Sequence, residues 1–467
     1  MKRSIVWFRN DLRIHDNEAL IDAIKQNDQV IPVYIFDDRV FRSKSRFGFP
    51  KTNKFRCQFI IDAVKDLKLQ LQKLGSDLVV RQGISEDVIS DIASEYKTSY
   101  VYCNRERTQE EVDVQDALEH HLWQIGQEVR YYRGKMLYHT GDLPFPISHC
   151  PDTFTQFRKE VEKYIPIREP LELDTESINS IPEGLDVGSI PVISDFGWSE
   201  IDENAIVVRG GESEALKELK YYLWDTDLIA NYKETRNGLL GRDYSSKFSA
   251  YLAQGCLSPK KVYQEVKRYE SERKKNKSTY WLIFELLWRD FFRFMAKKHG
   301  NKIFLASGIQ DNGKPPSVDK PELFEKWQLG MTGIPFVDAN MRELNTTGFM
   351  SNRGRQNVAS FLVKDLKLNW LLGAEYFESM LIDYDPCSNY GNWNYVAGVG
   401  NDPREDRYFN IASQAKRYDP DAVYMKHWLP ELSEANADKL QNPFSDADNE
   451  LYLDYNYPPP CIHIKHW

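Results

Sequence analysis

The sequence has few of the features that mark secreted, metal-stapled or membrane-spanning proteins. Its 6 cysteines show no CxxC spacing and lack paired histidine ligands, which argues against a disulfide framework or a zinc site and favours reduced, buried thiols. No apolar run approaches the length that crosses a bilayer. A strand-like segment, SIVWF, begins after three residues and leaves no room for a signal peptide. We therefore expect a cytoplasmic protein with no membrane segment and no metal.

The chain also has no excess of positive charge, because its 467 residues carry a net charge of −9. The charge is unevenly distributed: residues 1–210 sum to −8, residues 211–430 to +4 and residues 431–467 to −5. Local charge governs contacts with phosphates, so an acidic chain can still bind nucleic acid through one basic region. Any phosphate-binding face is expected in the middle block.

Residues 1–135 alternate between strand-like and helix-like segments. The strand-like runs are SIVWF, VIPVYIF, DLVVRQG, SYVYCN and EVRYYRG. Helical patterns lie between them, notably over 53–74 and 110–123, and this alternation predicts an α/β domain with a parallel sheet and flanking helices. No GxGxxG follows the first strand, where RNDLRIHDN stands instead, so a Rossmann-type dinucleotide site is not expected in this domain.

The rest of the chain divides into three parts. Residues 136–211 are predicted to be an interdomain connector, because 171–208 hold nine Asp or Glu, no Lys or Arg, and several Pro and Gly, which is typical of a solvated segment. From 212 to 430, apolar residues recur at helical spacing, which predicts an all-α second domain. Residues 431–467 form a short acidic, Pro-rich tail that we expect to be irregular or disordered. No heptad or broad apolar stripe is evident, so a monomer is expected.

Between residues 333 and 410, polar side chains alternate with large aromatic ones. The polar residues are Asn352, Arg353, Arg355, Asp383, Asp385 and Asn389, and the aromatic ones are Trp370, Trp393 and Tyr395. Buried polar groups among large aromatic rings are tolerated only when partners satisfy them. The pattern therefore predicts a large polar cofactor in the helical domain.

This region resembles the photolyase/cryptochrome family of flavoproteins, and its details are most similar to the cryptochrome-DASH branch. The motifs that carry the resemblance are WFRNDLRIHDNEAL at 7–20, YKETRNGLLGRDYSSKFSAYLAQGCLSP at 232–259, FELLWRDFFRFM at 284–295 and the ending GVGNDPREDRYFN at 398–410. Several long motifs in the same order are far more specific than one short motif. The resemblance spans nearly the whole chain.

The resemblance implies an FAD site among the C-terminal helices. SSKFS at 245–249 places hydroxyls and a cation before a helical run, where a helix N-terminus can seat a pyrophosphate, although a serine there is by itself an ordinary helix cap. Arg355 and Asp383 are expected to form a buried ion pair beside the isoalloxazine, against the alternative of a salt bridge that only joins two helices. Asn389 takes the position that faces flavin N5, where a neutral amide suits a reduced flavin. The expected FAD-binding residues are Tyr232, Ser245, Ser246, Lys247, Phe248, Ser249, Glu285, Arg289, Phe292, Asn352, Arg355, Asp383, Asp385 and Asn389.

Helical spacing puts Glu285, Trp288, Arg289 and Phe292 on adjoining sides of one helix. By itself this spacing favours an amphipathic core helix with a charged rim. The resemblance implies that Glu285 and Trp288 contact a pyrimidine-dimer lesion, through a hydrogen bond to a thymine and a stacking face. The expected catalytic residues are Glu285, Trp288, Asn352, Gln356 and Tyr395.

Two positions bear on the substrate. Gln356 and Tyr395 stand where conventional cyclobutane photolyases have Met and Trp, so this lesion pocket is more polar and stacks less well. Extracting a lesion costs less from a single strand than from a duplex, so the resemblance implies repair of cyclobutane pyrimidine dimers chiefly in single-stranded DNA. A (6-4) photolyase would bring a catalytic His that these positions lack. A blue-light photoreceptor cryptochrome that binds DNA or a protein partner is the alternative, and Asn389, Glu285 and the short tail favour the enzyme.

The resemblance also implies a chain of tryptophans that carries electrons to the flavin. Trp393 and Trp370 match its inner two members, although core packing is the usual role of a Trp. Counting back from Trp327, the outer position falls on Ser317, and a serine cannot be oxidised by an aromatic radical cation. Light-driven flavin reduction is then expected to end at Trp370 or to leave through another Trp or Tyr.

Two further sets of residues complete the expectations. The predicted phosphate contacts are Arg236, Arg353, Arg404 and Arg407, although each alone is more often an ordinary surface arginine. NRERTQEE at 104–111 is similar to the DASH segment whose Glu contacts 5,10-methenyltetrahydrofolate, which makes Glu106 the candidate antenna contact. Acidic residues that open a helix after a strand are also ordinary first-turn chemistry.

Overall fold

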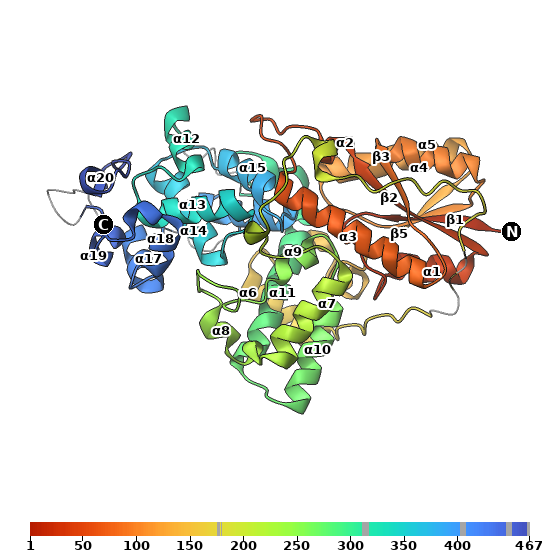
Figure 1. The fold of residues 1–467 in the computed structure, drawn as a ribbon. Helices are drawn as coiled ribbons and strands as arrows, with labels where there is room; N and C mark the ends of the chain where they lie inside the picture. The colour runs from red at the N-terminus through yellow and green to blue at the C-terminus, as the bar shows by residue number, and fades with distance from the viewer. Residues whose placement is uncertain (175–177, 179, 311–316, 402–407, 445–450, 465–467) are drawn as a thin grey trace.

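The computed structural model describes residues 1–174, 178, 180–310, 317–401, 408–444 and 451–464, without the side chains of 452 and 453. A sheet domain holds the N-terminus, and a helical domain extends from it to the C-terminus at the opposite end of the molecule (Figure 1). Over the described residues, no helix is both long enough and apolar enough to cross a membrane.

The sheet is parallel throughout and has the strand order β3-β2-β1-β4-β5. Its strands are β1 (Arg3–Phe8), β2 (Gln29–Asp37), β3 (Val79–Gly83), β4 (Tyr100–Asn104) and β5 (Glu128–Tyr132). The helices of this domain are α1 (Glu18–Gln26), α2 (Asp38–Phe41), α3 (Lys54–Lys73), α4 (Ser85–Glu95) and α5 (Gln109–Gln124). The predicted α/β domain with a parallel sheet is therefore confirmed.

Alternation along each strand builds two separate cores. In β1, Ile5 and Trp7 pack into the core beneath α4 and α5, whereas Val6 and Phe8 face the larger core beneath α1 and α3. Successive side chains of a strand point to opposite faces, so an unbroken apolar run predicts a sheet covered on both sides. Figure 1 shows α4 and α5 together on one side of the sheet and α1 and α3 on the other.

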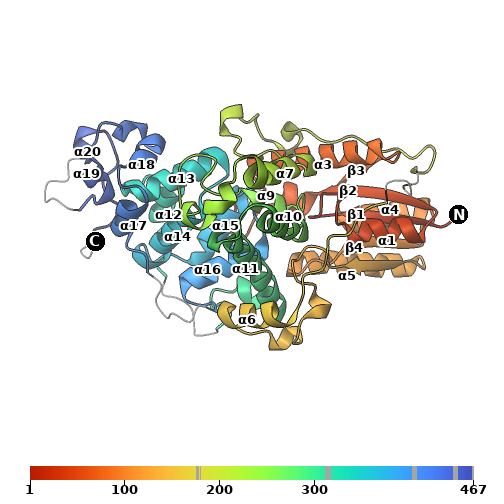
Figure 2. The same cartoon turned by 90° about the horizontal axis from the view of Figure 1, so that it is seen from below.

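The second domain is helical, as predicted. Its helices are α7 (Glu212–Lys220), α8 (Tyr232–Thr235), α9 (Phe248–Ala253), α10 (Pro259–Glu272), α11 (Lys277–His299), α12 (Pro321–Leu329), α13 (Pro335–Thr347), α14 (Asn352–Ser360), α15 (Trp370–Met380), α16 (Pro386–Ala397), α17 (Ile411–Tyr418) and α18 (Val423–Trp428). Helix α6 (Phe154–Tyr164) precedes them and lies beside α11 (Figure 2).

The longest of these helices, α11, has clear local signals at both ends. The Asn276 side chain accepts hydrogen bonds from the amides of Ser278 and Thr279. The Thr279 hydroxyl in turn accepts a hydrogen bond from the Asn276 amide, which completes a capping box. The last turn carries Lys297 and Lys298, whose charges complement the negative end of the helix dipole. The sequence thus fixes where this helix begins and ends.

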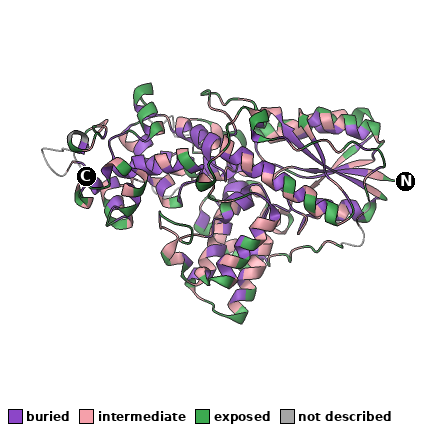
Figure 3. Ribbon diagram, in the orientation of Figure 1, coloured by how far each residue is buried: buried purple, intermediate pink, exposed green. Residues whose placement is uncertain are grey.

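Buried carboxylates join the helical domain to the sheet domain and to the connector. Glu212, the first residue of α7, accepts hydrogen bonds from the amides of Ile14 at 2.7 Å and His15 at 3.1 Å. Asp290 of α11 accepts from the amides of Leu137 at 3.2 Å and Tyr138 at 2.8 Å. These carboxylates satisfy loop amides that folding would otherwise leave buried without partners. Figure 3 shows the buried residues concentrated in the strands and along the helices between the domains.

The connector is less solvated than its composition predicts. The amide of Val80 donates to the carbonyl of Val187 at 2.8 Å, so part of the connector runs along the edge strand β3. Leu185 and Ile193 are buried, and the Phe196 ring packs 5.6 Å from that of Phe36. An exposed sheet edge offers unpaired backbone groups, and covering them outweighs the acidic composition.

The tail, which we expected to be irregular, has short helices within otherwise irregular backbone over its described residues. A 3-10 helix (Pro430–Leu432), α19 (Ala437–Gln441) and α20 (Leu451–Asp454) follow α18. Tyr457 is buried, and its hydroxyl donates to the Asp338 carboxylate of α13. The amide of Cys461 donates to the carbonyl of Thr332 at 2.7 Å. A few well-placed apolar residues among the acidic ones suffice to dock this segment on the helical domain.

Candidate active site

One cavity of about 500 Å³ in the helical domain collects the residues expected to bind the cofactor. We call it the helical-domain cavity. All of the expected FAD-binding residues line it, as do Trp288, Gln356, Tyr395, Trp393 and Arg236. They come from α8, from α9 and the loop before it, from α11, α14 and α16, and from the segment between α15 and α16. Residues far apart in the sequence therefore meet around one space.

The segment 245–247 leads into the short helix α9, which begins at Phe248, and Lys247 lies in the left-handed region at φ 54°. The Lys247 ammonium is buried and lies 3.5 Å from the ring centroid of Tyr244 and 4.5 Å from that of Phe349. Burial lowers the pKa of Lys247 to about 7, and the carboxylate of Glu343 offsets this only in part. An anionic group such as a pyrophosphate would stabilise this cation, so this end of the cavity fits the phosphates of FAD.

The Arg355–Asp383 pair forms with an Nη2–Oδ2 distance of 2.9 Å. The Asp383 side chain is buried, but that of Arg355 is 25% exposed, so the pair is only half buried. The second carboxylate oxygen of Asp383 is buried and has no hydrogen-bond partner in the described part of the chain. An unpaired buried acceptor is costly, and a ring N–H or a hydroxyl of a bound ligand would satisfy it.

Asn389 lies on α16 with its amide orientation fixed. Its Nδ2 donates to the carbonyl of Ala374 at 2.9 Å, and only the amide nitrogen can make that bond. The Oδ1 acceptor is thereby left for the cavity, which Asn389 lines. This arrangement fits a ligand that presents an N–H, as a reduced flavin does at N5.

Glu285 lies on the same cavity, with its carboxylate 2.8 Å from Arg236. Burial raises the pKa of Glu285, and the Arg236 cation partly reverses that effect. Arg236, expected to contact phosphate, is therefore engaged with this carboxylate.

The Trp288 ring is held from behind by Phe154 of α6, at 3.7 Å between centroids and 9° between planes. One face of Trp288 is thus occupied by the protein. Phe154 was not foreseen, because nothing in its local sequence marks it as a neighbour of α11.

Polar groups form the rim of the cavity near Tyr395 and Gln356. The Tyr395 ring stands edge-on to Trp288, with 5.8 Å between centroids. The Gln356 Oε1 accepts from Arg353 at 2.8 Å. Arg353 also donates to Asn237 at 2.8 Å and lies over the ring of Tyr418 at 4.6 Å. Arg353 therefore reaches the cavity only through Gln356, with its donors partly engaged. Arg404 and Arg407 lie outside the described residues.

The two expected electron carriers are buried side chains on neighbouring helices. Trp393 of α16 lines the cavity, and Trp370 begins α15. A Cβ at Gly373 would lie 2.2 Å from Cη2 of Trp393, so a glycine is needed for the two helices to pack this closely. Ser317 is exposed, and the next residue, Val318, donates its amide to Lys367 at 2.9 Å, which places Ser317 near the start of α15.

A second cavity of about 700 Å³, which we call the interdomain cavity, is lined by both domains. Glu106 lies in its wall, buried, and its carboxylate contacts Lys135 and lies 3.1 Å from Arg293. Arg293 in turn lies 2.7 Å from Asp385, which lines both cavities. Burial raises the pKa of Glu106, and the two cations more than reverse this, so the pKa lies below its ordinary value. Lys135 and Arg293 were not foreseen, although Arg293 follows Arg289 by one helical turn.

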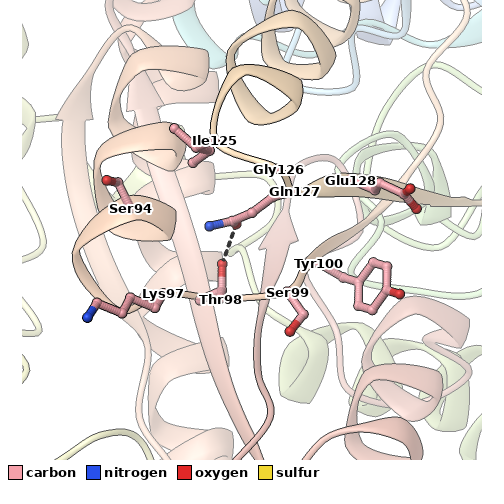
Figure 4. A pocket seen from close by; sticks show the side chains of 9 residues that line it. All are labelled: Ser94, Lys97, Thr98, Ser99, Tyr100, Ile125, Gly126, Gln127 and Glu128. Carbon is pink, nitrogen blue, oxygen red and sulfur yellow. Dashed lines mark hydrogen bonds between the residues drawn. The ribbon is translucent and has the colours of Figure 1, made fainter.

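A third hollow, of about 420 Å³, lies near the amino ends of β4 and β5 (Figure 4). The hydroxyl of Thr98 donates to Gln127 at 2.8 Å there. Tyr100 and Lys97 also line it, on opposite sides of Thr98 in this view. Ligands of parallel sheets bind at the carboxyl ends of strands, so this hollow is in the wrong place for a cofactor. In the described part of the chain, no cluster of three or more His, Cys, Asp or Glu side chains is suited to hold a metal ion.

The fold and the cavity together define a protein built from a sheet domain and a helical domain that can enclose a dinucleotide cofactor. Family models agree: residues 4–175 match that of DNA photolyase, and residues 281–467 match that of the FAD binding domain of DNA photolyase. Cryptochrome DASH of Xenopus laevis is 47% identical over 473 residues, which cover 99% of this chain and 90% of that protein.

Solved structures give the same result. The crystal structure of the cryptochrome of Synechocystis sp. superposes with a TM-score of 0.94 at 48% identity, covering 99% of this chain and 97% of that chain. A class III photolyase of Agrobacterium tumefaciens gives 0.84 at 28% identity, covering 99% and 95%. The chain therefore belongs to the photolyase/cryptochrome family, in its cryptochrome-DASH branch, and its helical domain is an FAD-binding domain of that family.

Proposed function

We propose that the protein is a light-driven photolyase that splits cyclobutane pyrimidine dimers, chiefly in single-stranded DNA. The observation that carries the proposal is the helical-domain cavity, which joins the residues that fit FAD to Glu285, Trp288, Gln356 and Tyr395 in one enclosure. When bound, reduced FAD supplies the electron that blue or near-ultraviolet light drives to the dimer, and the electron returns to it after the ring opens. The protein supplies placement, and the cofactor supplies the difficult chemistry.

The residues that surround the lesion have separate roles. Trp288 offers an extruded pyrimidine the face that Phe154 does not cover. Glu285 hydrogen-bonds a thymine and stabilises negative charge on the split dimer when its carboxyl is protonated, which its raised pKa favours. Asn352 and Gln356 hold the polar edges of the lesion from α14.

Single-stranded substrate is favoured by the polarity of the rim. Tyr395 meets Trp288 edge-on, so the two rings do not form a flat sandwich for a dimer. Gln356 and Arg353 add polar groups where an apolar wedge would help to separate a duplex. A lesion in a single strand needs no such wedge.

Two further elements belong to the proposal. Arg236, Arg353, Arg404 and Arg407 serve as phosphate contacts, with Arg236 released from Glu285 or shared with it when DNA binds. The interdomain cavity, with Glu106 in its wall, holds a folate such as 5,10-methenyltetrahydrofolate as a light-collecting antenna. Its position against Asp385 brings it next to the helical-domain cavity, as energy transfer requires.

The direct test uses the reduced holoprotein with dimer-containing oligo(dT), single- and double-stranded, under blue light. Recovery of thymine absorbance is expected on both substrates, severalfold faster on the single strand. Equal rates would remove the strand preference. No recovery on either, with FAD bound and reduced, would contradict repair and favour a photoreceptor role.

A further inference from the structure

The two expected electron carriers of this chain, Trp393 and Trp370, do not reach the protein surface. Trp370 is buried, and its indole N–H donates to the carbonyl of Ala306 at 3.2 Å. The outer position is Ser317, whose hydroxyl cannot give up an electron to a tryptophan radical cation. An oxidised Trp370 therefore needs another electron donor. Without one, the electron comes back from the reduced flavin before an external reductant can act.

Tyr390 is the aromatic side chain that meets Trp370 among the described residues. The two ring centroids are 6.2 Å apart, with the planes at 76°. Tyr390 is buried, at 4% exposure, on α16 and three residues before Trp393. Its hydroxyl donates to the Glu378 carboxylate of α15 at 3.3 Å. A phenol in contact with both a tryptophan and a carboxylate is placed for coupled loss of an electron and a proton.

Tyr390 and Glu378 also line the interdomain cavity. Arg56, Tyr384, Lys51 and Glu110 stand around Glu378 there. Burial raises the pKa of Tyr390, so its phenol does not ionise by itself at neutral pH. Burial also raises the pKa of Glu378, which makes its carboxylate a stronger proton acceptor, while Arg56 and Lys51 partly oppose that effect.

We propose that Tyr390 is the terminal electron carrier of light-driven flavin reduction in this protein and takes the place of the missing outer tryptophan. Trp393 and Trp370 pass one electron to the oxidant, which is the photoexcited, oxidised isoalloxazine, and leave Trp370 one electron short. Tyr390 then gives one electron to Trp370 and its phenolic proton to Glu378, which leaves a neutral tyrosyl radical. A thiolate in solution returns one electron to the Tyr390 oxygen through the interdomain cavity, and Glu378 returns the proton. The inference rests on the proposed flavin site.

A rival route leads in another direction. The Phe377 ring lies 5.2 Å from Trp393 and 6.2 Å from Trp327, and Trp327 lies 5.9 Å from Tyr376. Phenylalanine is not oxidised under these conditions, so a hole would have to pass Phe377 in one step. The Tyr390 route instead ends in a direct ring contact between Trp370 and Tyr390.

The test is light-driven reduction of the oxidised holoprotein with a thiol as donor, comparing wild type with Tyr390→Phe. The reduction rate is expected to fall roughly tenfold or more, since the hole on Trp370 recombines before the thiol acts. Electron paramagnetic resonance is expected to show a neutral tyrosyl radical in wild type and none in Tyr390→Phe. Adding Ser317→Trp to Tyr390→Phe should restore the rate. Tyr376→Phe, another buried tyrosine of this region, is the matched control and should leave it unchanged.

Several outcomes would overturn the inference. An unchanged rate and radical spectrum in Tyr390→Phe would do so, as would loss of the rate in Tyr376→Phe instead. If Tyr390→Phe does not fold, ring-deuterated tyrosine in the wild-type chain must narrow the radical spectrum, and a tryptophan radical would refute the assignment. Repair by chemically reduced protein is expected to be equal in wild type and Tyr390→Phe. Its absence in both would count against the proposed function, not against Tyr390.

Discussion

The Glu285 carboxylate both lines the helical-domain cavity and forms an ion pair with Arg236 at 2.8 Å. Removing it both strips a hydrogen bond from the lesion and leaves Arg236 half buried without its counter-charge. An amide at this position keeps the shape and the hydrogen bond but not the charge. Comparing the two replacements therefore separates hydrogen bonding from charge.

Glu285→Ala is expected to lower the repair yield per absorbed photon severalfold, while FAD stays bound. Glu285→Gln is expected to keep most of the yield, because an amide N–H can still donate to a thymine carbonyl. Both are measured as thymine recovery per photon on single-stranded oligo(dT), with flavin absorbance as the check on occupancy. An unchanged yield in Glu285→Ala would take Glu285 out of the mechanism.

At the scale of elements, one side chain of the tail, that of Tyr457, makes a hydrogen bond to the helical domain. Tyr457 enters the helical domain and donates to Asp338, which also accepts from the amides of Thr332 at 2.8 Å and Gly333 at 3.0 Å ahead of α13. Burial raises the pKa of Asp338 to about 6, and the hydrogen bonds hold it from rising further. The tail therefore completes the hydrogen bonding of a carboxylate at the start of a core helix.

Tyr457→Phe removes a donor from this buried carboxylate and is expected to lower the free energy of unfolding by about 1–3 kcal/mol. Urea denaturation followed by fluorescence measures the change. Tyr455→Phe, a half-buried tyrosine two residues earlier, should cost far less. Equal losses in the two variants would mean that the contact between Tyr457 and Asp338 contributes no special stability.

For the whole molecule, the buried ion network between the domains is the feature that sequence alone gave least reason to expect. Glu106 of the sheet domain contacts Lys135 and Arg293, and Arg293 continues to Asp385 beside the helical-domain cavity. Charges buried this deeply persist only when each has a partner. The network therefore fixes how the two domains dock as well as the wall that separates the two cavities.

Glu106→Gln leaves two buried cations with one counter-charge fewer and is expected to cost about 3–5 kcal/mol of unfolding free energy. Glu110→Gln is the matched control, because the Glu110 side chain is 77% exposed in its pair with Lys51 and should cost less than about 1 kcal/mol. Urea denaturation of the holoprotein measures both. Similar small losses would mean that water or a proton replaces the missing charge at position 106.

Much of the molecule was determined by the sequence. Alternating apolar strands and amphipathic helices set the parallel sheet, because side-chain periodicity is a local property. The caps of α11 and the order of its polar side chains set a helix that presents Glu285, Trp288 and Arg289 to one space. Only the tertiary structure decided that Phe154 covers one face of Trp288, that Arg236 pairs with Glu285 and that Tyr390 meets Trp370. Those contacts join segments that are distant in sequence, and packing between elements leaves no periodic trace in either segment.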